Sequence, residues 1–273
     1  MTPENVPMPD LRIVPTSSVR PHEAHDMQRS APLIERMRGE TFMINPPLVA
    51  PLDHDNYVVL DGANRVFSFN ALGYRHILVQ IASYDSGLVE LATWQHVVCS
   101  WNAQAFMHQL RQVPELTIQN GNSDSQNPIA TVYLRQGETQ HLSVTPDELG
   151  LRNQALRHVV HLYEHSALLQ RTNLEDIGSI WRYHPDGIAL VRFRPYTPDE
   201  ILASASGGSP LPAGVSRHIV HGRAVRVNYP LDLLRDENVS LEEKNAQLQS
   251  WLVNKVAHRH VRYYAESTYQ FDE

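Results

Sequence analysis

The segment of residues 57–73 restricts the fold more than any other part of the chain. Four apolar residues that end at Leu60 predict a buried strand, and the Asp61-Gly62 pair that follows predicts a sharp turn. A helix is expected to start at once, over residues 63–72, and to be closed by the glycine after it. A strand that turns directly into a helix is typical of an α/β unit.

The same corner predicts an anion site. Gly62 lets a ligand approach the backbone closely. The free N–H groups at the start of the helix and the guanidinium of Arg65 can receive phosphate oxygens, while Asp61 can hold a metal ion or a hydroxyl proton. The alternative is a tight turn in which Arg65 pairs with a nearby carboxylate.

Strand and helix signals continue on both sides of the corner and predict an α/β (α+β) fold. A compact N-terminal domain is expected over residues 11–100 and a mixed α/β region over 101–273. The other expected strands cover residues 11–19, 48–50, 76–81, 88–98, 129–134, 140–144, 188–193, 218–227 and the tail after 261. The other expected helices cover residues 31–39, 102–112, 151–169 and 241–258.

Two capping signatures predict further helix starts. Thr145 with Glu148 forms a capping-box pattern, with a break expected near Gly150. Thr197-Pro198 repeats the arrangement of a capping residue followed by proline.

Charge and composition exclude several classes of protein. The net charge of −7 disfavours a general duplex-DNA binder. No apolar run approaches the ~20 residues of a membrane span, and the start of the chain lacks a signal-peptide pattern. The sole cysteine, Cys99, excludes a disulfide within the chain. These features predict a cytoplasmic protein that does not enter membranes.

Common catalytic motifs are absent, so nucleotide chemistry would need a less common site. The sequence contains no G-x-x-x-x-G-K-[S/T], no G-x-G-x-x-G, no zinc-type cysteine pattern and no G-x-S-x-G. The segment of residues 20–26 instead concentrates two histidines and two acids before a helix, so a carboxylate there could act as general base. The alternatives are a metal site built from His22, His25 and Asp26, or a solvated loop that caps the next helix.

Two further segments could line a pocket. Trp94, between Thr93 and the Gln95-His96 pair, could form the wall of a small-ligand pocket, or it could be a core residue beside an incidental histidine. Residues 216–226, rich in arginine and placed after a flexible Gly/Ser/Pro loop, could capture a carboxylate or phosphate under a lid. The alternative for that segment is an edge strand whose arginines face water.

Four segments in this order resemble the ParB/sulfiredoxin-like superfamily, and most closely its free-serine kinase branch. They are His22-Glu23, the corner from Leu60 to Arg65, Thr93 to His96, and Ser216 to His218. The resemblance implies an N-terminal nucleotide- and phosphate-binding domain, with the mixed C-terminal region closing over it and completing the substrate pocket. It also implies a nucleotide-dependent kinase that converts free L-serine to O-phospho-L-serine.

The resemblance implies a role for each matched residue. Glu23 would be the base, and Asp61 would assist the hydroxyl or hold Mg²⁺. The nucleotide, which is ATP, ADP or CTP among the relatives, would lie against Gly62, Ala63, Asn64 and Arg65. The amino acid would contact His22, Trp94, His96, Ser216, Arg217 and His218, of which Ser216 and Arg217 would bind its carboxylate.

Two residues depart from the family pattern and keep other functions open. Asn64 stands where the family often has histidine, and Val215 stands where a lysine is expected before the Ser-Arg pair. The alternatives are a ParB-like transcriptional regulator that binds DNA or nucleotide, and a non-catalytic ligand-binding module. The expected partners are a nucleotide and a small amino acid, and the helix over residues 241–258 or the aromatic tail could form a homodimer.

Overall fold

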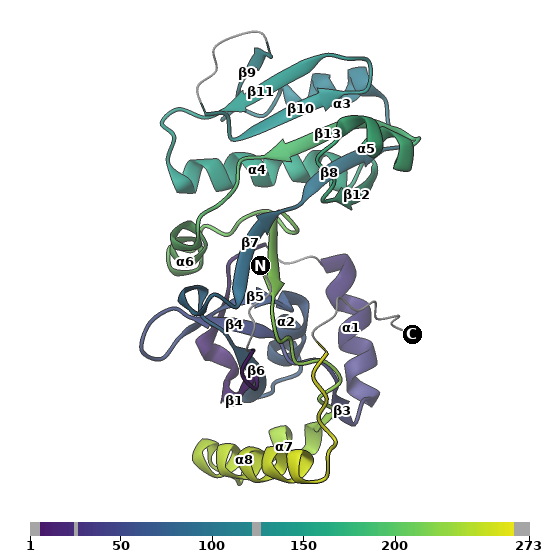
Figure 1. The fold of residues 1–273 in the computed structure, drawn as a ribbon. Helices are drawn as coiled ribbons and strands as arrows, with labels where there is room; N and C mark the ends of the chain where they lie inside the picture. Colours follow the sequence, from purple (N-terminus) through teal and green to yellow (C-terminus); the bar gives the residue numbers. More distant parts are fainter. Residues whose placement is uncertain (1–5, 25–26, 122–126, 265–273) are drawn as a thin grey trace. The chain divides into compact units, whose positions relative to one another are not determined.

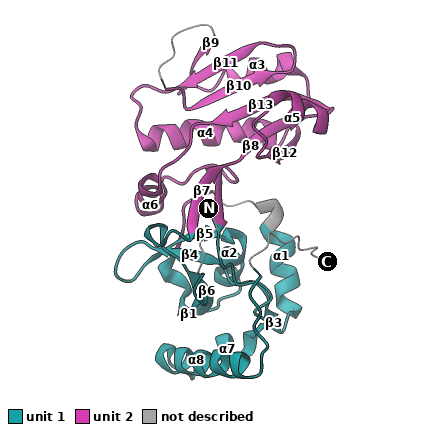
Figure 2. Cartoon of the chain, in the orientation of Figure 1, with its two compact units in different colours: residues 1–19, 27–88, 220–273 teal, residues 20–26, 89–219 magenta. Residues whose placement is uncertain are grey.

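The computed structural model describes residues 6–24, 27–121 and 127–264. His25 and Asp26, named above as alternative metal ligands, lie outside the described residues. The chain forms two compact units (Figure 2). Unit 1 contains residues 1–19, 27–88 and 220–273, and unit 2 contains residues 20–26 and 89–219. Among the described residues, no helix is both long and apolar enough to cross a membrane.

Unit 1 is built on a mixed sheet that carries the Asp61 corner (Figure 1). Its strand order is β1 (Asp10–Pro15), β6 (His76–Ile81), β4 (Leu48–Pro51), β5 (Tyr57–Asp61) and β2 (Val19–Pro21). Strands β4 and β6 run parallel, whereas β1 pairs with β6 and β4 with β5 in antiparallel fashion. Alternating apolar residues such as Ile13 and Leu78 face each other in register and are buried.

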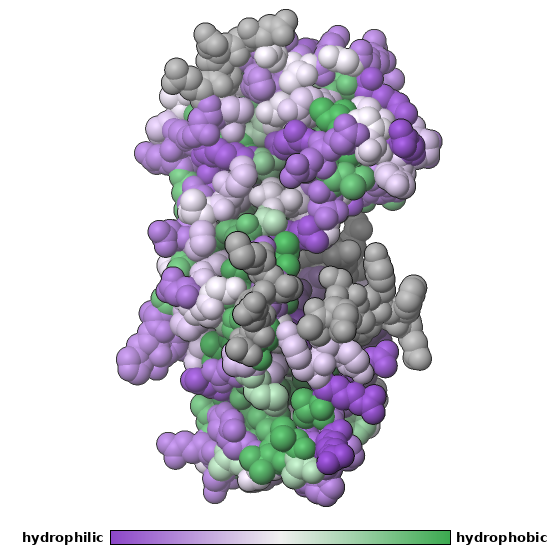
Figure 3. All heavy atoms as spheres, viewed as in Figure 1, coloured by the Kyte–Doolittle hydropathy of each residue, from purple (hydrophilic) through white to green (hydrophobic). Residues whose placement is uncertain are grey.

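Helices and short strands cover this sheet. They are the short 3-10 helices η1 (Thr16–Ser18) and η2 (Tyr84–Ser86), the helices α1 (Met27–Gly39), α2 (Ala63–Ala71), α7 (Leu231–Arg235) and α8 (Leu241–Ala257), and the paired strands β3 (Phe42–Met43) and β15 (Tyr229–Pro230). Helix α8 is fixed to β1 because the Asn245 side chain exchanges two hydrogen bonds, of 3.0 and 2.8 Å, with the backbone of Ile13. Hydrophobic side chains near α7 and α8 are visible in Figure 3, where Leu233, Val253 and Val256 are exposed.

Unit 2 is built on a six-stranded sheet. Its strand order is β12 (Leu168–Thr172), β8 (Gln95–Cys99), β13 (Gly187–Phe193), β10 (Ala130–Leu134), β11 (Thr139–Ser143) and β9 (Thr117–Asn120), and every neighbouring pair is antiparallel. Its helices are α3 (Ala103–Leu110), α4 (Leu149–Glu164), α5 (Ile177–Tyr183) and α6 (Pro198–Ser206). A separate two-stranded pair joins β7 (Val89–Thr93) to β14 (Ser216–Val220).

The predicted α/β fold class is confirmed, and several elements match closely. The strand over residues 76–81 has the predicted bounds. The helix starts predicted at Thr197 and Ser240 both carry complete capping boxes. The expected division at residue 100 differs from the compact units, because the chain enters unit 2 after Leu88 and the segment from Val220 onward belongs to unit 1.

Four local predictions were wrong. The segment after Thr145 is not helical, because Asp147 pairs with Arg194 and α4 starts only after Glu148. Helix α4 runs through Gly150 without a break. The helix expected over 151–169 ends at residue 164, because residues 168–172 pair with β8 as a strand. The strand expected over 218–227 ends at residue 220, and residues 261–264 of the tail form no strand.

Candidate functional site

The strand–helix corner of unit 1 has the geometry of an anion site. Gly62 precedes α2 in the left-handed region at φ +92°, and a Cβ there would lie 3.2 Å from the Cα of Pro47. Its carbonyl accepts the N–H groups of Arg65 and Val66, at 2.9 and 3.1 Å. Among the described residues, no side chain caps this end of the helix. The N–H groups of the first turn therefore point toward a position where a phosphate can bind.

Two arginines and one carboxylate surround this helix start. Asp61 is half-exposed, and its Oδ2 lies 3.0 Å from Nη2 of Arg223 and 4.0 Å from Nη2 of Arg65. Arg65 also donates to the carbonyl of Asn45. Both readings of the sequence are therefore present, since Arg65 lies beside a carboxylate and also at a helix N-terminus with two cations.

Arg223 belongs to this corner, although it was not among the predicted site residues. It donates to the carbonyl of Pro46 at 2.6 Å and to Oε1 of Gln80 at 3.1 Å. Gln80 in turn donates to the carbonyl of Gly222 at 2.9 Å and accepts from the N–H of Ala224 at 2.8 Å. The only sequence signal was the arginine-rich segment of residues 216–226, because the pairing with Asp61 spans 162 residues.

Gly62→Ala is expected to destabilise unit 1 more than Gly73→Ala. Both glycines flank α2 and have positive φ, at +92° and +74°, so alanine costs about 1–2 kcal/mol at either position. Only at Gly62 would the new Cβ meet backbone, whereas nothing lies within 4 Å at Gly73. We expect at least about 1 kcal/mol of extra loss in urea unfolding for Gly62→Ala. Equal losses would contradict the described close approach to Pro47.

The carboxylate of Glu23 is the centre of a second cluster, which lies in unit 2. The segment around Glu23 pairs with Leu211, whose carbonyl accepts the N–H of Ala24 at 2.6 Å. Oε2 of Glu23 accepts the N–H of Gly214 at 2.9 Å. Oε1 accepts the N–H and the hydroxyl of Ser216, at 2.9 and 2.6 Å. The carboxylate is 16% exposed and already accepts a proton donor from an alcohol, as a general base for a hydroxyl must.

His22 completes this cluster from the buried side. Its Nε2 lies 2.7 Å from Oγ of Ser216. Because that hydroxyl donates its single proton to Glu23, Nε2 of His22 must carry the hydrogen of this bond. The ring of His218 packs edge-on against His22 at 5.3 Å between centroids. His22 and His218 therefore support the Glu23–Ser216 pair.

His96 is fully buried, so the structure gives it a supporting position inside unit 2. Its Nε2 must donate to the carbonyl of Gly214 at 2.9 Å, and its Nδ1 accepts the hydroxyl of Tyr163 at 2.8 Å. Burial lowers the pKa of His96 to about 4, although the bond to Gly214 opposes this shift. His96 thus fixes the loop whose N–H groups hold Glu23.

Acidification is expected to weaken unit 2 through His96. Its folded pKa lies below the unfolded value of about 6.5, so the unfolded chain binds more protons and stability falls as the pH drops below about 6.5. From pH 7.5 to 5 the loss is about 2 kcal/mol in urea unfolding. His96→Gln should remove most of this loss, whereas His141→Gln, in the same sheet, should retain it. An equal loss in His96→Gln and in the native chain would contradict the assignment.

Trp94 and two arginines lie around the same loop. The guanidinium of Arg217 stacks over the ring of Trp94 at 4.6 Å, and the N–H of Trp94 donates to the carbonyl of Val215. The guanidinium of Arg171 packs against Gly214, because a Cβ on that glycine would lie 2.0 Å from its Cζ. Sequence analysis missed Arg171, which lies in β12, a strand that had been predicted as helix.

The predicted site residues therefore form two clusters, one in each unit. The corner cluster of unit 1 holds Asp61, Gly62, Ala63, Asn64 and Arg65, and gains Arg223. The Glu23 cluster of unit 2 holds His22, Glu23, Trp94, His96, Ser216, Arg217 and His218, and gains Arg171. A cavity of about 480 Å³ in unit 1 is lined by Asp10, Asp53, His54, Gln80 and His221, among others, and residues 61–65 are not part of its lining.

Solved structures with this fold are free serine kinases. The structure is similar to "SbnI with C-terminal truncation" from Staphylococcus aureus, with a TM-score of 0.75 and 25% identity over 90% of this chain and 97% of that chain. It also shares its fold with "Free serine kinase in complex with AMP", at a TM-score of 0.70 and 16% identity over 86% of this chain and 98% of that chain.

Sequence comparison gives the same kind of relative. The chain is 26% identical over 267 residues to the ATP-dependent L-serine kinase SbnI of Staphylococcus aureus, covering 96% of this chain and 97% of the relative. A 74-residue segment is 36% identical to the ATP-dependent L-serine kinase of Desulfurococcus mucosus, covering 27% of this chain and 29% of the relative. No protein-family model matches the chain.

Proposed function

We propose that this protein is a nucleotide-dependent kinase that phosphorylates free L-serine to O-phospho-L-serine. The observation that carries the proposal is the alignment of 96% of the chain with an ATP-dependent L-serine kinase, which extends through both units. The two clusters supply groups of the kinds that such a reaction needs, namely a carboxylate base and cations for phosphate.

Unit 2 acts on the acceptor. Glu23 takes the proton of the serine hydroxyl, and the substrate hydroxyl replaces that of Ser216 as the donor to Oε1, since the 2.6 Å contact with Ser216 has the length of such a bond. His22 and His96 act as positioning residues, because one bonds to Ser216 and the other to the carbonyl of Gly214. The deprotonated oxygen then attacks the terminal phosphorus of the nucleotide.

Arg217 and Arg171 bind the carboxylate of serine. The lysine of the family pattern is Val215 here, and its side chain is fully buried, so it supplies no charge. Arg171, packed on Gly214, replaces that cation beside the loop that holds Glu23. Arginine is suited to this task because its planar fork matches a carboxylate.

Unit 1 binds the nucleotide phosphates. The first N–H groups of α2, at Ala63 and Asn64, and the guanidinium of Arg65 receive the oxygens of the transferred phosphate. Asn64 donates hydrogen bonds but carries no charge. Arg223, which lies 3.0 Å from Asp61, adds a cation that the family pattern did not predict. ATP is the proposed donor, following the names of the relatives.

Asp61 fits one ligand position of a Mg²⁺ ion. Its carboxylate is half-exposed, and Mg²⁺ prefers oxygen ligands, commonly one or two carboxylates together with the phosphates of a nucleotide. When bound, the ion would neutralise charge on the phosphates. Arg65 and Arg223 limit the negative charge that Asp61 offers, so the phosphates must supply part of the affinity.

Product analysis tests this function directly. The purified full-length chain is incubated with L-serine and ATP, ADP or CTP, and the products are separated by mass spectrometry. We expect O-phospho-L-serine with ATP, formed only when serine is present. Nucleotide binding without any phosphorylated product would instead support a non-catalytic ligand-binding module.

Three broader expectations remain proposals. Unit 1 is proposed to be a ParB/sulfiredoxin-like domain, because its sheet carries the Asp-Gly corner and the following helix. A homodimer is proposed through the exposed Val253 and Val256 of α8, and light scattering would detect it. The cytoplasmic location stays a prediction.

A further inference from the structure

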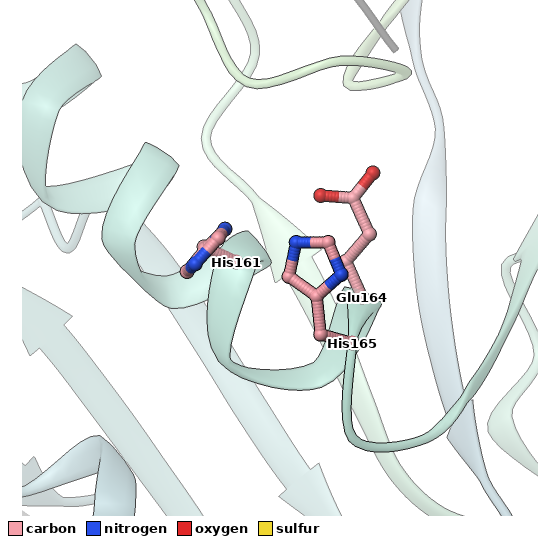
Figure 4. Close-up of side chains that lie close together, drawn as sticks. All are labelled: His161, Glu164 and His165. Atoms are coloured by element: carbon pink, nitrogen blue, oxygen red, sulfur yellow. The ribbon is translucent and has the colours of Figure 1, made fainter. Parts of the chain in front are cut away.

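The last turn of α4 carries three metal-ligand side chains outside both clusters. They are His161, Glu164 and His165, and their ligand atoms all lie within 4.8 Å of one another (Figure 4). Helix α4 ends at Glu164, and His165 is its C-cap residue. None of the three takes part in the reaction proposed above.

Their spacing along the helix explains why they meet. Positions i, i+3 and i+4 project from one face, so both imidazoles and the carboxylate lie side by side. The rings of His161 and His165 are 4.5 Å apart between centroids and nearly perpendicular. Both histidines are exposed, and these three side chains make no hydrogen bond or ion pair with another residue in the described part of the chain. They can therefore turn toward a common ion without breaking other contacts.

The donor set selects the kind of ion. Two imidazole nitrogens with one carboxylate oxygen suit zinc, nickel, copper and iron, whereas Mg²⁺ and Ca²⁺ prefer oxygen ligands alone. The carbonyl end of the helix carries partial negative charge, which favours a cation at this position. Three protein ligands leave a fourth tetrahedral position for water.

We propose that His161, Glu164 and His165 form a binding site for a divalent transition-metal ion of the zinc class. The ion closes the last turn of α4, which also carries Tyr163, the hydrogen-bond donor to His96. Binding therefore stabilises the end of the helix that supports the Glu23 loop. The site is separate from the proposed Mg²⁺ position at Asp61, because the two lie in different units.

A zinc titration tests the proposal. Full-length protein without a histidine tag is freed of metal with EDTA, and Zn²⁺ binding is measured by competition with a chromophoric chelator. The double variant His161→Gln/His165→Gln should bind at least about tenfold more weakly, since loss of a second-shell partner alone costs about 10–100-fold. His158→Gln, on the same helix but paired with Glu115, is the matched control and should bind as the native chain does. A hundredfold excess of Mg²⁺ should not displace the zinc.

Two results would overturn the proposal. One is native binding weaker than about 1 mM. The other is an unchanged affinity and stoichiometry in the double variant, which would assign zinc to other histidines. Circular dichroism of the metal-free variants should match that of the native chain, because the replaced side chains are exposed. If the double variant unfolds, Glu164→Gln serves as the replacement, with the same expected loss.

Discussion

Glu23→Gln lowers kcat for serine phosphorylation about 10³-fold, because a positioned general base contributes about 10²–10⁴-fold. The amide nitrogen of glutamine cannot accept a hydrogen bond, so the variant loses both the base and one of the three bonds that hold the loop of Gly214 and Ser216. The affinity for ATP is expected to stay within about threefold of the native value, because its phosphates bind at the corner of unit 1. Steady-state kinetics and nucleotide titration measure the two effects separately.

Glu115→Gln is the matched control for Glu23. Glu115 also lies in unit 2, is 12% exposed and accepts hydrogen bonds from Gln154 and His158, but it is not part of the Glu23 cluster. Its kcat should remain close to the native value. A Glu23→Gln variant that keeps kcat within about threefold of the native chain would contradict the assignment of the base.

Arg65→Met weakens ATP binding about 10- to 100-fold, because it removes charge-assisted hydrogen bonds worth about 1.5–3 kcal/mol. AMP binding should change less, since the guanidinium is assigned to the transferred phosphate, which AMP lacks. Arg65→Lys should lie between the two, because lysine keeps the charge but loses the planar fork. Isothermal titration with ATP and AMP provides both affinities.

Arg75→Met is the control for this substitution. Arg75 is also in unit 1, but it is 66% exposed and pairs with Glu237 on the surface. Its loss should leave both affinities unchanged. Because Arg65 donates to Asn45, urea unfolding must show that Arg65→Met is folded. An equal loss of ATP and AMP affinity in the folded variant would place Arg65 away from the transferred phosphate.

The corner could be predicted from the sequence because its signals are local. An apolar strand, an Asp-Gly turn and an early arginine follow one another within a few residues, and each has a direct structural meaning. The partners of that corner could not be predicted in the same way. Arg223 reaches Asp61 only because the chain turns at Gly222, which has φ +77°, and Gln80 then holds the backbone on both sides of Arg223.

Other errors arose where long-range pairing overrides local pattern. Leu168 and Leu169 extend the apolar pattern of α4, but they form a strand because they pair with Cys99 and Val98 of β8. That error concealed Arg171. Glu23 was predicted from its neighbours His22 and Ala24, whereas its hydrogen-bond donors lie more than 190 residues away.

The most direct test of the central claim is the serine dependence of phosphate transfer, followed by ³¹P NMR with the native chain and Glu23→Gln. The account predicts that ATP and L-serine give an O-phospho-L-serine signal with the native chain, none without serine, and a rate about 10³-fold lower in the variant. ATP hydrolysis that is unaffected by serine, with no phosphoserine signal, would contradict it.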